Sequence, residues 1–252
     1  MGAWPASRGG PSVTEVSEAE RPKTMGTTNE ASLTTTRPED QRTFAPSLVM
    51  LSRPTDASAE AIRALRTHIM AQHVQKGRRA LAICGASPGV GCTFVAANLA
   101  VALAQIGVKT LLLDANLRAP RLDRLISPLR EGHGLLQCLS SDNVSFIDSI
   151  EPDVLPDLSV MYAGGVASNP QELLAGGRFK QLVDFCLRDF DATIVDTPPA
   201  NGSADVRRIS TVIGYSLIVT RRNRTFVEDV KILTGQLEAD HARVVGTVLN
   251  QA

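Results

Sequence analysis

Residues 81 to 93 read LAICGASPGVGCT, and this stretch decides the fold of the chain. A run of apolar or small residues from Leu81 leads into a turn that contains Gly89 and Gly91, and Thr93 opens a long apolar helix pattern. A strand, a glycine-bearing loop and a helix N-terminus in this order bind phosphate, because the loop N–H groups point inward and the positive end of the helix dipole faces the anion. The stretch therefore predicts a phosphate-binding loop in an α/β domain.

The loop departs from the Walker A pattern, G-x-x-x-x-G-K-[ST], at its first glycine and at its lysine. Ala86 stands at the first glycine position and Cys92 at the lysine position, whereas Gly91 and Thr93 fit the pattern. The backbone cradle is therefore predicted to be present without the charge of the lysine. The residues that we assign to the nucleotide in this loop are Ser87, Pro88, Gly89, Val90, Gly91, Cys92 and Thr93.

The cysteine at the lysine position also has a predicted chemistry. A thiol in the first turn of a helix has its thiolate favoured by the same field that favours phosphate. We therefore expect Cys92 to be the most reactive of the four cysteines and to be shielded by bound nucleotide. The alternative is a small space-filling residue that took the place of a dispensable lysine.

Composition limits the function classes. The chain has 252 residues, with 26 basic and 26 acidic side chains, so no net charge directs it to nucleic acid or anionic lipid. Its four cysteines lack metal-ligand spacing, which indicates free thiols in a reducing compartment. No apolar run approaches the roughly 18–20 residues of a membrane helix, and the N-terminus lacks a signal core. We expect a cytoplasmic protein without nucleic-acid partners or a membrane span of its own.

Two parts of the chain differ in composition. Residues 1–44 are rich in Ser, Thr, Pro, Gly and Glu and lack a hydrophobic period, so they cannot bury enough apolar area to offset their ordering entropy. We predict a disordered tail at 1–44 and one nucleotide-binding domain at 45–252. The apolar run from Leu48 to Leu51 is expected to pack on that domain.

Within the domain, predicted strands alternate with predicted helices. This order indicates a parallel sheet with right-handed crossovers and helices on both faces, the P-loop NTPase type of α/β fold. Two apolar runs end in an acid, at Asp114 and Asp196, and parallel strands place such residues at the edge of the sheet where ligands bind. The predicted strands are 81–85, 109–114, 158–162, 191–196, 217–219 and 244–249.

An amphipathic helix is predicted from residue 58. Glu60, Arg63 and Arg66 share one face of it, because spacings of three bring helical side chains together. On spacing alone, an ion pair within one solvated helix is the favoured explanation.

Six segments, in this order along the chain, resemble the bacterial tyrosine kinases of capsule and exopolysaccharide synthesis, which are relatives of the ParA and MinD ATPases. The resemblance extends from about residue 48 to residue 250 and so covers the whole predicted domain. The segments are the helix with Glu60, Arg63 and Arg66, the loop at 87–91, LLLDANLR at 111–118, NPQELL at 169–174, IVDTPP at 194–199 and VLN at 248–250.

The resemblance implies roles for individual residues. Asp114 matches the first acid of the second Walker A-like motif of the family, which lies near magnesium and the acceptor hydroxyl. Asp196 matches the Walker B acid, which acts on the magnesium shell, and Thr93 would supply its hydroxyl to the metal. Asn250 lies where relatives contact adenine. The implied cofactors are ATP or ADP with Mg²⁺, and the implied catalytic residues are the two aspartates.

The resemblance also implies partners. In the family, the helix that carries Glu60, Arg63 and Arg66 packs against the nucleotide region of a neighbouring subunit and closes a ring. We therefore predict a homo-oligomer with these residues at the interface. Family members work with membrane-spanning chain-length regulators, also called co-polymerases, whose cytoplasmic ends dock on the kinase. The implied location is the cytoplasmic side of the inner membrane, through such a partner.

Three departures from the family bear on activity. Cys92 replaces the lysine, Asn116 replaces the second acid of the Asp-x-Asp pair, and no tyrosine cluster follows the last strand. The two tyrosines, Tyr162 and Tyr215, are expected to be packing residues. We therefore predict a nucleotide-binding regulator of exopolysaccharide chain length or export with weak or no kinase activity. The alternatives are an active tyrosine kinase or ATPase that borrows a basic residue from a neighbour and, more distantly, a ParA-like positioning ATPase.

Overall fold

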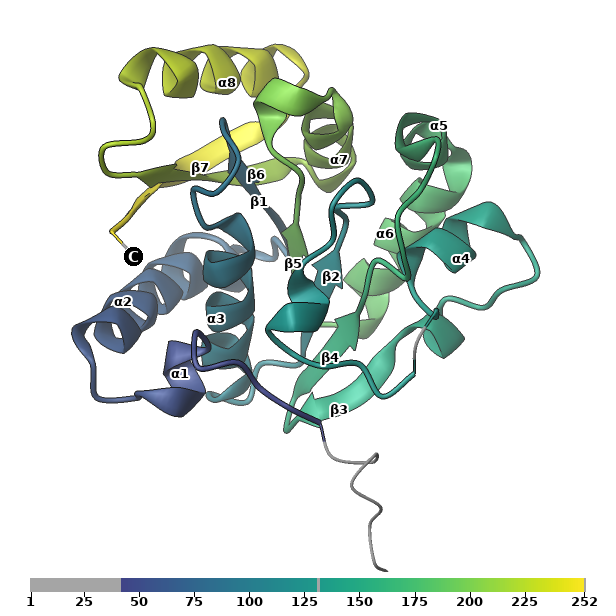
Figure 1. The fold of residues 1–252 in the computed structure, drawn as a ribbon, viewed down its shortest axis with the longest axis horizontal. Helices are drawn as coiled ribbons and strands as arrows, with labels where there is room; N and C mark the ends of the chain where they lie inside the picture. Colours follow the sequence, from purple (N-terminus) through teal and green to yellow (C-terminus); the bar gives the residue numbers. More distant parts are fainter. Residues whose placement is uncertain (1–41, 131, 252) are drawn as a thin grey trace, which may run out of the picture. The chain divides into compact units, whose positions relative to one another are not determined.

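The computed structural model describes residues 42–130 and 132–251 (Figure 1). Most of the predicted tail at 1–44 therefore lies outside the described residues. Its last residues contact the domain: Phe44 forms an isolated β-bridge with Ile126, and the Arg42 guanidinium lies 2.6 Å from the Glu151 carboxylate.

A seven-stranded sheet in the order β3-β4-β2-β5-β1-β6-β7 forms the centre of the described domain. All neighbouring strands are parallel except β3, which pairs antiparallel with β4 at one edge. The predicted α/β fold with a parallel sheet is thereby confirmed. The strands are β1 (Ala80–Gly85), β2 (Thr110–Asp114), β3 (Glu151–Leu155), β4 (Leu158–Met161), β5 (Ala192–Asp196), β6 (Tyr215–Arg221) and β7 (Arg243–Asn250).

Helices cover both faces of this sheet (Figure 1). One face packs against α1 (Val49–Ser52), α2 (Ala57–Gln72) and α3 (Cys92–Ala104). The other packs against α4 (Leu135–Ser140), α5 (Pro170–Ala175), α6 (Gly177–Asp189), α7 (Asp205–Ile213) and α8 (Val227–Ala239). Short 3₁₀ helices are η2 (Val74–Lys76), η3 (Leu122–Arg124), η4 (Ile147–Ser149) and η5 (Ala200–Gly202).

The continuous apolar runs follow from this layering. In β1, Leu81 and Ile83 belong to the core on the α3 side, whereas Ala82 and Cys84 belong to the core on the α7 side. A strand buried on both faces has no position at which a polar side chain would reach water. Helix α3 is buried from residue 95 to residue 104 for a similar reason, because it lies between the sheet and α1 and α2.

The apolar run that precedes α2 packs on the domain as predicted. Leu48, Val49 and Met50 are at most 2% exposed and belong to the same core as α3. The Asn98 side chain on α3 anchors this segment, since its Oδ1 accepts the Met50 N–H at 3.2 Å. The segment therefore holds the start of α2 against α3.

Candidate nucleotide-binding site

The predicted phosphate loop connects the end of β1 to the start of α3. Gly91 precedes the helix with a φ of 102°, and a Cβ built there would lie 2.1 Å from Nδ2 of Asn250. Only glycine fits both the left-handed backbone and this close approach. Asn250, at the end of β7, donates from Nδ2 to the Val90 carbonyl oxygen at 2.9 Å, so it braces the outer side of the loop. Its expected contact with adenine remains a prediction.

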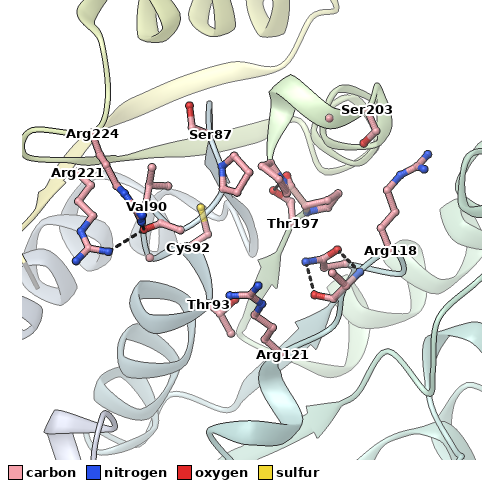
Figure 2. A pocket seen from close by; sticks show the side chains of 18 of the residues that line it. Ser87, Val90, Cys92, Thr93, Arg118, Arg121, Thr197, Ser203, Arg221 and Arg224 are labelled. Atoms are coloured by element: carbon pink, nitrogen blue, oxygen red, sulfur yellow. Dashed lines mark hydrogen bonds between the residues drawn. The ribbon is translucent and has the colours of Figure 1, made fainter.

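A cavity of about 610 Å³ lies over this loop (Figure 2). All seven loop residues that the sequence assigned to the nucleotide line it, from Ser87 to Thr93. The opposite wall comes from the segment that follows β2, and Thr197 and Ser203 belong to the segment that follows β5. The cavity thus opens at the carboxyl ends of the parallel strands, where ligands of open α/β sheets bind.

The two strand-ending acids lie side by side in the sheet. Asp114 and Asp196 are register partners on β2 and β5, and each is 1% exposed. Thr93, which lines the cavity, donates its hydroxyl to Oδ2 of Asp196 at 2.6 Å. The structure therefore brings together the three residues that the sequence assigned to the metal.

Burial dominates the electrostatics of this acid pair. Desolvation raises the pKa of Asp114 from 3.8 to about 6, although backbone N–H groups of Asn116 and Leu122 donate to its carboxylate and oppose the shift. Desolvation, and next the charge of Asp114, raise the pKa of Asp196 well above its ordinary value. Two adjacent buried carboxylates without a cation are unfavourable, so the pair favours a proton or a metal ion.

The residues present fit Mg²⁺. Oδ1 of Asp196 is buried and has no hydrogen-bond partner within the described residues. Residues 42–130 and 132–251 hold no group of three or more His, Cys, Asp and Glu side chains able to bind a metal by themselves. Magnesium is usually held by one or two carboxylates together with substrate phosphates and water. The ligand set of Asp196, Thr93 and Asp114 matches such a shared site, in which the nucleotide completes the coordination.

Asn116 has a local role in the cavity wall. Its Nδ2 donates to the Ala119 carbonyl oxygen at 2.9 Å, and its Oδ1 accepts the Ala119 N–H at 3.1 Å. Both ends of the amide therefore close the turn that follows β2. The residue that replaces the second acid of the family motif shapes the loop between β2 and η3.

Four arginines line the cavity, and the sequence analysis assigned none of them. Arg221 and Arg224, at the end of β6 and just after it, both donate to the Gly89 carbonyl oxygen, at 3.0 and 3.3 Å. Arg118 forms a two-point contact with the buried Asp205 carboxylate, at 2.6 and 3.2 Å. Arg121 is the fourth. Arg118 ends the LLLDANLR segment, but spacing along the chain could not show that it or any of the other three arginines reaches the loop.

The expectation that the Cys92 thiolate is favoured is wrong, whereas its reactivity relative to the other three cysteines and its shielding by nucleotide remain predictions. A Cβ at Gly85 would lie 2.8 Å from the Cys92 sulfur, so the thiol is directed toward the end of β1. Burial, and next the charge of Asp196, raise the pKa of this thiol well above its ordinary value. The field of the helix N-terminus is outweighed, since the sulfur lies in a desolvated position close to a carboxylate.

The helix face with the two predicted interface arginines makes contacts within the chain. The Arg63 guanidinium lies 3.0 Å from the Glu60 carboxylate and also donates to the Pro54 carbonyl oxygen at 2.5 Å. Arg66 donates to the Ala102 carbonyl oxygen in the last turn of α3 at 3.2 Å. The intrahelical ion pair is present, and a role at a subunit interface remains a prediction.

Both tyrosines pack as expected. Tyr162 is 5% exposed, and its hydroxyl accepts a hydrogen bond from Arg42 at 2.8 Å. Tyr215 has His73 edge-on against its ring, with 4.9 Å between ring centroids, and the Arg78 guanidinium lies 4.9 Å from the ring centroid. Neither side chain lines the cavity.

Comparisons with known proteins agree with this geometry. Residues 76–252 match the ParA family model, described as NUBPL iron-transfer P-loop NTPase. The tyrosine-protein kinase etk of Escherichia coli K12 is 33% identical over 201 residues, which are 79% of this chain and 27% of Etk. The chain is also similar to the crystal structure of the chimerical protein CapA2B2. The sequences are 32% identical, and the TM-score is 0.75, with 82% of this chain and 91% of that chain covered. The chain belongs to the bacterial tyrosine kinase family.

The family's kinase domains share the fold over most of their length. The kinase domain of Escherichia coli tyrosine kinase ETK has a TM-score of 0.76 and 31% identity, covering 84% of this chain and 82% of that domain. The predicted family is thereby confirmed, and membership of a P-loop NTPase family implies nucleotide binding, generally with Mg²⁺. The chain spans about a quarter of full-length Etk. Among the described helices, none is long and apolar enough to cross a bilayer.

Proposed function

We propose that this chain binds Mg-ATP or Mg-ADP in the cavity over residues 87–93 and has weak or no kinase activity. One observation carries the proposal: the phosphate loop and the Thr93–Asp196 contact are intact, while a thiol with a raised pKa stands in the lysine position. The backbone N–H groups and the metal ligands suffice to hold a nucleotide. The charge that the lysine would place on its terminal phosphates is missing at that position.

Different residues would hold the phosphates and the Mg²⁺ ion. The N–H groups of the loop and of the first turn of α3 would hold the phosphates, aided by the helix dipole. Thr93, Asp196 and Asp114 would hold Mg²⁺, which neutralises charge between the terminal phosphates when bound. Loss of one donor aimed at developing charge costs about 2.7–4 kcal/mol, or roughly 10²–10³ in rate. This cost is the reason to expect little phosphoryl transfer.

The strand order supports one orientation of the nucleotide. The acid pair belongs to β2 and β5, and Arg221 and Arg224 lie at the end of β6, on the other side of β1. Terminal phosphates that face the acids would leave the ribose and base beside these two arginines. Guanidinium groups bind phosphate oxygens and also stack on aromatic rings, so they suit this end of the ligand.

We further propose that the chain acts in exopolysaccharide biosynthesis as a regulatory subunit that controls chain length or export. In this role it would form a homo-oligomer through the α2 face with Glu60, Arg63 and Arg66. It would dock on the cytoplasmic end of a membrane-spanning co-polymerase and so reside at the inner membrane. The membership of the bacterial tyrosine kinase family supports this role.

A second candidate function is an active tyrosine kinase or ATPase. The four arginines that line the cavity favour it, because they offer positive charge close to the loop. A ParA-like positioning ATPase is the more distant alternative, and the family membership disfavours it.

Isothermal titration calorimetry with Mg-ATP and Mg-ADP tests the proposal, in parallel with the Etk kinase domain. We expect saturable binding to the native chain that is weaker than binding to Etk. Phosphate release and tyrosine phosphorylation of a synthetic peptide should stay near background.

Thr93→Val is the matched control, because it keeps the shape of the side chain and removes the hydroxyl. It should lose the gain in affinity that Mg²⁺ gives to the native chain. Turnover equal to that of Etk would establish the second candidate instead, and a native chain that does not bind either nucleotide would refute both.

A further inference from the structure

Three of the four cavity arginines have partners within the protein. Arg118 is held by the Asp205 carboxylate, and Arg221 and Arg224 are held by the Gly89 carbonyl oxygen. In the described part of the chain, the Arg121 side chain is the only one of the four without a hydrogen bond or ion pair to protein. Its guanidinium therefore has its full set of donors available to a ligand.

The backbone at Arg121 is fixed close to the acid pair. The N–H of the next residue, Leu122, donates to the Asp114 carboxylate at 3.3 Å, and the Arg121 carbonyl oxygen accepts the Arg124 N–H at 3.1 Å. The Leu122 side chain is fully buried, and Arg121 stands directly before η3. The residue is thus anchored at its main chain while its side chain is exposed to the cavity.

The side chain points across the cavity toward the start of α3. Arg121 and Thr93 line the same cavity, and Figure 2 shows the Arg121 guanidinium directed toward Thr93. Figure 2 also shows Arg118 directed away from Thr93. Arg121 is therefore the cation that faces the predicted magnesium side of the loop.

We propose that Arg121 binds the terminal phosphates of the nucleotide from the β2 side and supplies, for binding of the nucleotide rather than for phosphoryl transfer, the charge that a Walker A lysine supplies from the helix. This inference rests on the proposed nucleotide binding. A guanidinium is always protonated and contacts phosphate oxygens at two points, so it is chemically suited to the task. The ligand class is a nucleoside diphosphate or triphosphate, with the triphosphate making the larger demand on this charge.

The other arginines are poorer candidates for this position. Removing Arg118 from Asp205 would leave a carboxylate of 1% exposure without its cation. Arg221 and Arg224 would have to leave Gly89 and cross to the other side of β1. Arg121 needs only to keep the direction that it already has.

Calorimetry on Arg121→Gln tests the assignment, with Arg124→Gln as the matched control. Arg124 is the last residue of η3, the 3₁₀ helix that Arg121 precedes; it is exposed and does not line the cavity. We expect Arg121→Gln to weaken Mg-ATP binding at least about tenfold, the lower end for a hydrogen bond to a charged group. The loss should be smaller for AMP, and Arg124→Gln should bind as the native chain does.

A double-mutant cycle with Cys92→Lys separates phosphate binding from a structural effect. If Arg121 does the work of the lysine, Cys92→Lys should tighten binding strongly in the Arg121→Gln background and only slightly in the native one. Arg121→Lys should retain part of the affinity.

Two outcomes would overturn the assignment of Arg121 and leave the proposed nucleotide binding intact. They are equal gains in affinity from Cys92→Lys in both backgrounds, and native affinity in Arg121→Gln. Absence of nucleotide binding by the native, folded chain would overturn the proposed function together with this assignment. Circular dichroism of each variant shows whether its domain is folded. If Arg121→Gln is not folded, the affinity of Arg121→Lys for Mg-ATP is compared with that of the native chain instead.

Discussion

Asp196→Asn should stabilise the nucleotide-free protein at pH 8. The Asp196 carboxylate has one oxygen that accepts the Thr93 hydroxyl and one buried oxygen without a partner in the described residues. An asparagine keeps a carbonyl oxygen for Thr93 and places an amide nitrogen in the second position. It also removes a buried negative charge beside Asp114, whose own carboxylate then has a neutral neighbour.

Asp114 gives the scale of the effect. Burial raises its pKa from 3.8 to about 6, so the folded state keeps a proton that the unfolded state has lost. The resulting loss of stability is absent below about pH 4, grows between pH 4 and 6, and is constant above that range. At about 1.4 kcal/mol per pKa unit, two units amount to about 3 kcal/mol at pH 7. Asp196 has the same sign, because its pKa is also raised.

Urea unfolding at pH 4.5 and pH 8, in the presence of EDTA, measures this loss. The native chain should lose about 2 kcal/mol or more of its unfolding free energy between the two values, because about 1 kcal/mol of the loss that follows from the Asp114 shift has already occurred at pH 4.5. Asp196→Asn should lose clearly less. Asp184→Asn, which changes an exposed acid on α6, should follow the native curve. Addition of Mg-ADP at pH 8 should recover stability in the native chain and not in Asp196→Asn.

Two outcomes would refute this reasoning. One is an Asp196→Asn variant that is less stable than the native chain at pH 8. The other is an equal dependence on pH in both proteins, which would mean that the two acids do not share a desolvated site.

Two further predictions concern the loop and the oligomer. Because the Cys92 pKa is raised by burial and by Asp196, iodoacetamide should label Cys92 slowly at pH 8 and faster in Asp196→Asn; rapid labelling of the native chain would contradict the inward direction of the thiol. Arg63→Glu should lower the mass measured by light scattering without unfolding the domain, since an exposed ion pair within a helix is worth only about 0.3–0.5 kcal/mol to the fold. A native chain that is monomeric with and without nucleotide would remove the basis for the proposed interface.

Local sequence determined the fold, the phosphate loop and the pair of strand-ending acids. The apolar runs that end at Asp114 and Asp196 had to be parallel strands buried on both faces, and the carboxyl ends of such strands meet at one edge. Gly89 and Gly91 of the phosphate loop have positive φ angles, which glycine adopts readily. These signals depend on neighbours within a few residues, which is the range over which spacing and backbone geometry are informative.

Two elements had no readable signal. Strand β3 contains Pro152 and two acids, and it pairs only at the antiparallel edge of the sheet, where the demands on strand composition are weakest. Its Glu151 is buried because Arg42 and two backbone N–H groups bind its carboxylate. Helix α7 carries Asp205 at its start, and this acid is buried by its contact with Arg118. Pairings across such separations in sequence are not encoded in local periodicity.

Only the tertiary structure decided the charge distribution around the loop. It brought Arg121, Arg221 and Arg224 to the cavity over the phosphate loop, although each of them lies more than 20 residues from that loop in sequence and the loop lacks its own lysine. It also directed the Cys92 thiol toward the end of β1, where burial and next the charge of Asp196 raise its pKa instead of lowering it. Both results depend on side-chain direction, on burial and on the distance between charges, and packing between distant segments sets all three. Electrostatic interactions weaken with distance in space, which spacing along the chain does not report.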